Sequence, residues 1–252
     1  MRLVATVFLV ASALNPCLFS SCTVKENRDP CPALLRLGLP AESDSLKELY
    51  ITVENPYGEE VTYRRPLAAA DTFLCFQVTR EKFLLTVSSV NLAGGYSAST
   101  GEPYPRLYLY RARVRIGGEN ATITPTLEKD YCTMEIGLTS PGKDLGMRVC
   151  SNYSGTDRAG NLIRSGYSVA TVPGGIVRVP RQGDNSLSLE IVDPEDDGIL
   201  RSFAIGEYLY RAGYDWAAPS LEDVTVQINY ARSTINFSTW YWDKTFDIAI
   251  DL

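Results

Sequence analysis

The chain has 252 residues, of which 45% are hydrophobic and 21% are charged, and its formal net charge is -6 at pH 7. This composition is too apolar for a disordered chain and too charged for a protein with many membrane spans. The excess of 30 acidic over 24 basic residues argues against a nucleic-acid partner, because neutralising phosphates requires clustered lysine and arginine.

The first 21 residues have the pattern of an export signal. Arg2 is the one charged residue of Met1–Ser21, and it precedes an apolar run from Leu3 to Leu14. Such a run is typical of a secretory signal peptide and is too short to cross a bilayer as a helix. It ends in small residues directly before Cys22, which is similar to the lipobox of bacterial lipoproteins. We therefore predict a lipoprotein signal peptide over residues 1–21.

Cys22 is the predicted lipidation site, and residues 22–32 are expected to form a polar, lipid-attached tether without core residues. The several acyl chains of a bacterial lipoprotein hold a protein firmly, at about 0.8 kcal/mol per buried CH₂ group. Cys17 is the weaker candidate because Pro16 stands where a small residue is wanted. The alternative is an ordinary cleavage near Ser21 that leaves Cys22 for a disulfide.

The remaining four cysteines are candidates for two disulfides, because exported proteins commonly form them. Four cysteines allow three connectivities, and the sequence leaves these open. If each half of the chain folds separately, the expected pairs are Cys31–Cys75 and Cys132–Cys150. A hairpin turning at residues 140–143 would bring the second pair together, although side-chain alternation would then require a twist or a bulge.

The first half after the tether has the alternation of short β-strands. Helical periodicity is scarce, and Glu42–Tyr50 is the best short candidate for a helix. Strands are expected where apolar and polar residues alternate between turn residues, at Lys47–Glu54, Val61–Arg65, Thr72–Thr79, Phe83–Val90 and Leu107–Ile116.

The second half repeats this pattern, with strands expected at Tyr131–Leu138, Leu145–Asn152, Ile176–Pro180, Leu187–Val192, Leu200–Tyr208, Val224–Tyr230 and Ser233–Trp240. A last amphipathic strand is expected within Trp242–Leu252. We place the boundary between Thr126 and Lys129. The predicted fold class is all-β, with an N-terminal sandwich over residues 33–128 and a C-terminal sandwich over residues 129–252.

Catalytic and metal-binding residues are not predicted. The chain has no histidine, which removes Ser-His-Asp and Cys-His catalysis and His-ligated zinc. The acidic run Asp193–Gly198 has the oxygen chemistry of a calcium loop but lacks the EF-hand spacing, and acids crowded in one loop seldom flank a glycosidic bond. A solvated loop is the preferred interpretation. We therefore expect no enzyme activity, no cofactor and no metal.

Two clusters of side chains have both a functional and a structural interpretation. Arg111, Arg113 and Arg115 share one face of an expected strand and could meet an acidic partner or lipid headgroups. A solvated face with acidic cross-strand partners is preferred. Gly213–Trp216 together with Trp240–Trp242 could form an aromatic shelf for a sugar, but packing in the core and at a sheet edge is preferred.

Several short motifs, taken in order, carry a resemblance to a known family. The lipobox-like Cys22 and the tether lead to the run Asp-Pro-Cys-Pro at Asp29–Pro32. Further motifs follow at Leu127–Cys132, Ile205–Tyr208, Gly213–Trp216, Leu221–Val226 and Trp242–Leu252. Through them nearly the whole chain resembles the FimB/Mfa2-type fimbrial anchor proteins of Bacteroidetes. Cys132 departs from the pattern, because a small apolar residue is expected there.

The resemblance implies two transthyretin-like β-sandwich domains in tandem, in a lipoprotein of the cell outer membrane that faces outward. It implies a structural role in adhesion, in which the protein anchors the base of a type V fimbria and limits its length. The implied partners are fimbrial subunits, through strand-mediated contacts, and the outer membrane, through lipid at Cys22.

Stalk pilins of this class lose a first strand, and a strand from a neighbour fills the open groove through main-chain hydrogen bonds. An anchor would keep its first strand, which is expected here at Ala33–Leu39. Arg36 lies inside that strand, so trypsin-like maturation near it is a possibility that the sequence leaves open. The alternatives are a stalk or tip subunit of the same superfamily and a surface glycan-binding lipoprotein, which the Trp-rich C-terminal region would suit.

Overall fold

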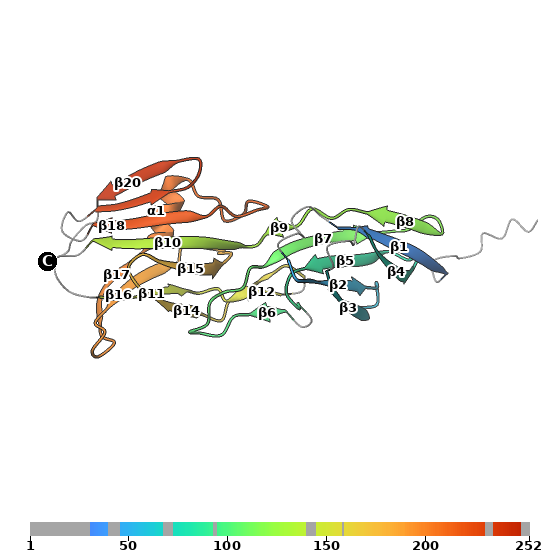
Figure 1. The fold of residues 1–252 in the computed structure, drawn as a ribbon, viewed down its shortest axis with the longest axis horizontal. Helices are drawn as coiled ribbons and strands as arrows, with labels where there is room; N and C mark the ends of the chain where they lie inside the picture. The colour runs from blue at the N-terminus through green and yellow to red at the C-terminus, as the bar shows by residue number, and fades with distance from the viewer. Residues whose placement is uncertain are drawn as a thin grey trace, which may run out of the picture.

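The protein is almost entirely β-structure, which confirms the predicted all-β class. The described part of the chain forms 20 strands and one short helix. Figure 1 shows an elongated molecule with the strands of the two halves toward opposite ends. The structure is a computed structural model that describes residues 31–39, 46–67, 73–92, 95–139, 145–157, 159–229 and 234–247.

The first half is built from two sheets that face each other across a core. One sheet has the order β3-β2-β5-β7-β9 and the other has the order β4-β1-β8. The strands are β1 (Pro32–Gly38), β2 (Glu48–Glu54), β3 (Glu60–Pro66), β4 (Phe73–Thr79), β5 (Phe83–Ser88), β7 (Tyr108–Val114), β8 (Asn120–Ile123) and β9 (Glu128–Lys129). Since alternate side chains point to opposite faces of a strand, each sheet buries one apolar row, including Leu35, Leu37, Leu49, Ile51, Leu85 and Val87.

The second half also has two facing sheets, with the orders β15-β10-β18-β19-β20 and β14-β11-β16-β17. The buried row between them includes Met134, Ile136, Val149, Leu189, Val226 and Phe237. The strands are β10 (Tyr131–Thr139), β11 (Gly146–Ser151), β14 (Tyr167–Thr171), β15 (Gly175–Pro180), β16 (Ser188–Val192), β17 (Ile199–Phe203), β18 (Val224–Asn229), β19 (Thr234–Ser238) and β20 (Asp243–Asp247).

The leading strand of each half has the same surroundings. β1 pairs antiparallel with β4 and parallel with β8, and β10 pairs antiparallel with β15 and parallel with β18. The two halves show no obvious sequence repeat, so this common arrangement is visible in the structure alone. The division into two transthyretin-like domains near residue 128 stays a prediction.

A small fifth sheet joins the halves. It has the order β13-β12-β6 and is made from β6 (Tyr96–Ser97), β12 (Gly155–Thr156) and β13 (Leu162–Ile163). Gly155 permits this pairing, since a Cβ atom there would lie 1.9 Å from the carbonyl oxygen of Tyr96. The segment between β5 and β7 also places Leu92, Ala98, Tyr104 and Leu107 in the core of the second half. The halves are therefore connected by a shared sheet and by core contacts, in addition to the covalent linker.

The alternation predicted most strands correctly. The strands expected between residues 47 and 116 are confirmed as β2, β3, β4, β5 and β7. Of the last expected strand, β20 accounts for Asp243–Asp247, and residues 248–252 lie outside the described residues. The helix candidate Glu42–Tyr50 is wrong where it is described, because Glu48–Tyr50 begins β2.

The strand expected over Leu200–Tyr208 is correct only in its first part, because helix α1 (Ile205–Ala212) follows β17. Ile205 and Leu209 are spaced by one helical turn, and both are fully buried. The helix ends at Gly213, whose φ of 91° is left-handed and whose amide donates to the carbonyl oxygens of Leu209 and Tyr210. Burial of one helical face therefore overrides the local alternation.

Candidate functional site

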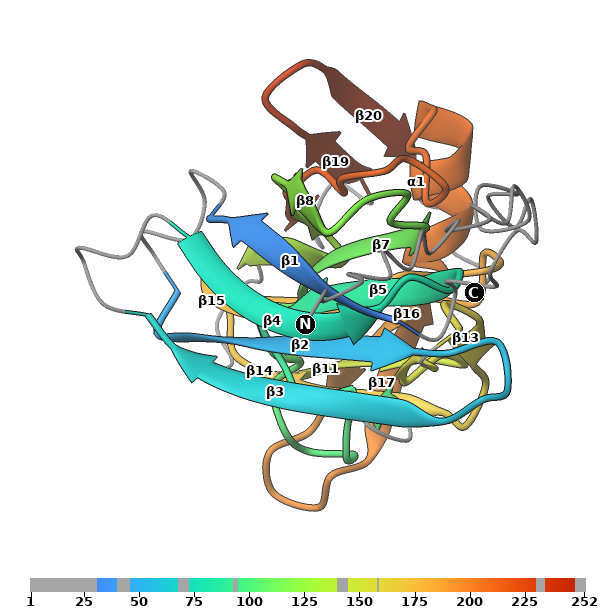
Figure 2. The ribbon, with the colours of Figure 1, turned by 90° about the vertical axis from the view of Figure 1, so that its right-hand side faces the viewer.

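The first strand, β1, is hydrogen-bonded along both of its edges. Its pairing with β4 runs from Pro32 opposite Thr79 to Gly38 opposite Phe73. On the other edge, Leu34 through Leu37 pair with β8, and Figure 2 shows β1 lying between these two neighbours. A middle strand engages its amides and carbonyls on both sides. Withdrawing β1 would therefore leave two open strand edges.

The side chains of β1 alternate between the core and the surface. Leu35 and Leu37 are fully buried, whereas Leu34 is 37% exposed and Arg36 is exposed on the outer face. Loss of β1 would therefore open an apolar groove that an extended segment of another chain could fill by strand addition. With β1 in place that groove is closed. The peptide bonds beside Arg36 lie within the paired strand, so a protease would need the strand to open first.

The predicted signal peptide, Cys22 and the tether up to residue 30 lie outside the described residues. Lipidation at Cys22 therefore stays a prediction. Within the described ranges, no helix is long and apolar enough to cross a membrane.

Cys31 and Cys75 are both free thiols, and the strand register explains why they do not meet. The carbonyl oxygen of Cys31 accepts a hydrogen bond from the amide of Arg80 at 3.1 Å, whereas Cys75 pairs with Arg36. The two cysteines are therefore separated by roughly 17 Å along the strands, at about 3.4 Å per residue. A disulfide requires Cα atoms within about 7 Å of each other. This expected disulfide is not formed in the structure.

Cys132 and Cys150 are free thiols as well, and the hairpin predicted to join them is wrong. β10 pairs with β15 and β18, whereas β11 pairs with β14 and β16, so the two strands belong to different sheets. Cys132 is fully buried in the core. Cys150 is half-buried on the row of Arg148, and burial, followed by the charge of Glu190, raises the pKa of its thiol to about 11.

We expect the thiols to differ in reactivity toward N-ethylmaleimide at pH 7. Cys75 is exposed and should be labelled in the native protein. Cys132 should stay unlabelled, because burial raises the pKa of its thiol to about 12 and the thiolate is the reactive form. Peptide mass spectrometry measures both. In denaturant without a reductant all four described cysteines should be labelled, and labelling that needs a reductant would instead support disulfides.

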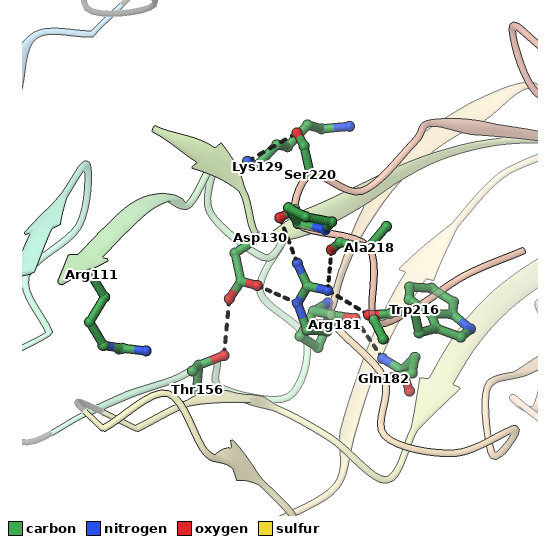
Figure 3. Close-up of polar contacts among 12 residues, drawn as sticks. Arg111, Lys129, Asp130, Thr156, Arg181, Gln182, Trp216, Ala218 and Ser220 are labelled. Atoms are coloured by element: carbon green, nitrogen blue, oxygen red, sulfur yellow. Dashed lines mark hydrogen bonds and ion pairs between the residues drawn. The ribbon is translucent and has the colours of Figure 1, made fainter. Parts of the chain in front are cut away.

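An ion pair between Asp130 and Arg181 lies at the junction of the halves (Figure 3). The distance from Arg181 Nε to Asp130 Oδ1 is 2.5 Å, and the two side chains are 17% and 9% exposed. The hydroxyl of Thr156, in β12, donates to Asp130 Oδ2 at 3.1 Å. Both oxygens of the buried carboxylate are therefore satisfied, as a buried charge requires.

The Arg181 guanidinium also holds the loop before β18. Its Nη1 donates to the carbonyl oxygens of Trp216, at 2.5 Å, and Ala218, at 2.7 Å. Its Nη2 donates to the carbonyl oxygen of Pro219 at 3.1 Å. Asp130 belongs to a motif noted in the sequence, but Arg181 carried no signal there. Its role depends on contacts with residues 35 or more positions away.

The row of three arginines divides between two environments. Arg113 and Arg115 are exposed, in agreement with a solvated face. Across β5, Arg113 lies opposite Leu84 and Arg111 opposite Thr86, so neither of these two has an acidic residue directly opposite it on that strand. Arg111 is half-buried, and its Nη2 donates to the carbonyl oxygen of Asp157 at 3.4 Å.

Burial lowers the pKa of Arg111. The side chain helps to line a cavity of about 270 Å³ together with Asp130, Thr156 and Arg181. Gly160 leaves space for it, since a Cβ atom there would lie 2.0 Å from Arg111 Nη1. Arg111 therefore belongs to the junction, which sequence reasoning missed because it depends on how the halves meet.

The acidic run Asp193–Gly198 forms a turn that uses its own carboxylates. Asp193 and Asp196 each accept a hydrogen bond from the main-chain amide two residues on, at 3.0 and 2.9 Å. Asp197 accepts one from Arg148 at 3.2 Å. Among the described residues, no group of three or more His, Cys, Asp or Glu side chains is arranged to hold a metal ion.

The aromatic residues considered as a sugar-binding shelf lie in two environments, the core and the surface. Tyr214 and Trp216 are buried, with ring centroids 4.7 Å apart, so core packing is confirmed for them. Trp242 is half-buried against the core of the second half. Trp240 and Tyr241 are 94% and 75% exposed, so the preference for burial is wrong at these two positions.

The fold is similar to those of solved proteins from Bacteroides and Porphyromonas. A candidate polysaccharide-binding protein from Bacteroides thetaiotaomicron has a TM-score of 0.64 at 9% identity, covering 85% of this chain and 98% of that chain. A candidate adhesin from the same species has a TM-score of 0.60 at 14% identity, covering 87% and 99%. The fimbrial anchor protein Mfa2 from Porphyromonas gingivalis has a TM-score of 0.55 at 8% identity, covering 84% and 99%.

No protein-family model matches the chain, and no curated protein matches its sequence. The structural likeness extends over nearly the full length of each of the three solved proteins. At 8–14% identity it is a likeness of fold. The resemblance noted in the sequence is thus confirmed at the level of the fold: this chain has the fold of the fimbrial anchor protein Mfa2 and of the candidate adhesin.

Proposed function

We propose that this protein is a non-enzymatic structural subunit of a type V fimbria, a lipoprotein of the cell outer membrane that anchors the base of the filament. The proposal is supported by the fold shared with Mfa2 over 84% of the chain. The observation that carries it is β1, which is paired on both edges and buries its leucine row.

A retained first strand determines which end of a polymer a subunit can occupy. In assembly by strand addition, each subunit must offer an open groove to the next one. A subunit that keeps its own β1 offers no groove at that position, so it can end a filament but cannot extend it there. Such a subunit at the base would also limit the length of the filament.

The lipid would supply the other half of the anchor. Residues between Cys22 and Cys31 span at most about 30 Å when fully extended, at roughly 3.4 Å per residue. The first sandwich would therefore be held close to the membrane surface and exposed outward, with fimbrial subunits as its partners. A stalk or tip subunit would differ in its mature N-terminus, which would begin after β1.

We expect Cys22→Ala to release fimbriae from the cell, because the base subunit would lose its acyl chains. Cell-free fimbriae in the medium are counted by electron microscopy, and Cys17→Ala serves as the matched control, with attachment unchanged. Mass spectrometry of the wild-type protein should show an acylated Cys22 and a retained β1. Attached fimbriae of normal length in the Cys22→Ala strain would contradict the proposal, as would a mature chain that starts after Gly38.

A further inference from the structure

A groove of about 570 Å³ opens beside the turn between β19 and β20. Three separate segments line it: Lys129 of β9, the segment that leads into β18 (Leu221, Glu222, Asp223 and Thr225), and the end of β19 with the turn after it (Ser238 to Tyr241). It lies outside the β1 sheet and outside the Asp130–Arg181 pair. The proposed fimbrial function makes no use of it.

One wall of the groove is formed by two neighbouring aromatic side chains. Trp240 is 94% exposed and Tyr241 is 75% exposed. The turn that carries them is hydrogen-bonded, because the Thr239 amide donates to the carbonyl oxygen of Trp242 at 2.8 Å. The Thr239 hydroxyl oxygen accepts from the amides of Tyr241, at 3.1 Å, and Trp242, at 3.3 Å. The main chain thus presents both rings to solvent from a fixed turn.

The other wall carries carboxylates and an ammonium group. Asp223 is 59% exposed, and its Oδ1 accepts hydrogen bonds from Lys129 Nζ and from the amide of Thr133. Glu222 also lines the groove, and its Oε2 is buried without a hydrogen-bond partner within the described part of the chain. This wall of the groove thus offers carboxylate groups as hydrogen-bond acceptors and one ammonium group as a donor.

We propose that this groove binds a neutral carbohydrate chain. The apolar face of a sugar ring would stack on Trp240 or Tyr241, while its hydroxyl groups would donate to the carboxylates of Glu222 and Asp223. Two acids against one lysine give the lining a net negative charge, which disfavours anionic glycans and anionic lipid headgroups. The one aliphatic lining residue, Leu221, is 3% exposed, so little surface is offered to an apolar peptide.

The test is affinity electrophoresis of the full chain in detergent, through gels that contain starch, mannan, xylan or mixed-linkage β-glucan. We expect at least one of these neutral polysaccharides to retard the protein. Trp240→Ala and Tyr241→Ala should each weaken this binding about tenfold, because each removes a stacking surface. Tyr57→Ala is the matched control, since Tyr57 is 80% exposed on the turn between β2 and β3, in the other half, and binding should not change.

Unaltered migration in all four polysaccharides would overturn the proposal, and so would retardation that is equal in Trp240→Ala and the wild type. Binding to phosphatidylethanolamine–phosphatidylglycerol vesicles that depends on Trp240, without polysaccharide binding, would assign the groove to the membrane and would also overturn it. Both altered residues are exposed, so matching thermal unfolding curves should show that the variants fold. None of these outcomes changes the expectation for Cys22→Ala, so the two proposals fail separately.

Discussion

Arg181→Ala is expected to lower the free energy of unfolding by about 3–5 kcal/mol, the usual cost of removing one partner of a buried ion pair. The variant would leave the Asp130 carboxylate, whose side chain is 9% exposed, without its cation. It would also remove the donors to three carbonyl oxygens in the loop before β18. The loss comes mainly from uncompensated buried polar groups, so it exceeds the net contribution of the pair itself.

Urea unfolding of the full chain, followed by circular dichroism, measures this effect. The matched control is Arg164→Ala, because Arg164 also pairs with an aspartate, Asp184, at 3.5 Å, but the two side chains are 66% and 37% exposed. An exposed pair contributes at most about 1 kcal/mol. Equal losses in the two variants would show that burial at the junction does not determine the effect.

If the protein is the base subunit that we propose, a filament attached to the second half would pull against the lipid attached to the first, and the junction would transmit the force. Asp130 directly follows β9, a strand in a sheet of the first half, and Thr156 lies in the small sheet that joins the halves. The Asp130–Arg181 pair connects these segments to the loop of residues 216–219 in the second half. A pull between the halves would therefore act on buried hydrogen bonds as well as on the covalent linker.

The sequence predicted where strands lie better than it predicted which strands pair. Alternation of apolar and polar residues identified β2, β5 and β7 as strands, and in β2 the alternating residues Leu49 and Ile51 are fully buried. It could not show that β10 and β11 lie in different sheets, since pairing depends on contacts between distant segments. Counting cysteines indicated how many could pair but not whether their positions allow it.

The candidate site was predictable to a similar extent. The first strand was expected at Ala33–Leu39 from the family resemblance, and it is β1, Pro32–Gly38. Arg181 was missed, and Arg111 was expected on a solvated face, since the surroundings of both form only when the halves meet. The exposure of Trp240 was also missed, because large aromatic side chains are usually buried and the sequence does not reveal how the β19–β20 turn presents the ring.

Strand β1 contains two adjacent leucines, one pointing into the core and the other toward the surface, so their variants can be compared. Leu35 is fully buried and Leu34 is 37% exposed. Leu35→Ala should lower the free energy of unfolding by about 2–5 kcal/mol, because it removes core contacts and leaves a cavity. Leu34→Ala should change it by about 0.5 kcal/mol or less, as is usual for surface positions. Urea unfolding of the full chain measures both.

The same pair of variants tests whether retention of β1 depends on its buried row. Trypsin can cut after Arg36 only when the strand leaves its two neighbours, so the cutting rate follows the population of that open state. Leu35→Ala should therefore speed cleavage after Arg36 in the native protein, while Leu34→Ala should leave it near the wild-type rate. Rapid cleavage of the wild type under native conditions would mean that β1 is loosely held. In that case the protein would resemble a subunit that is matured for polymerisation, and a closed groove would no longer support the proposed role as an anchor.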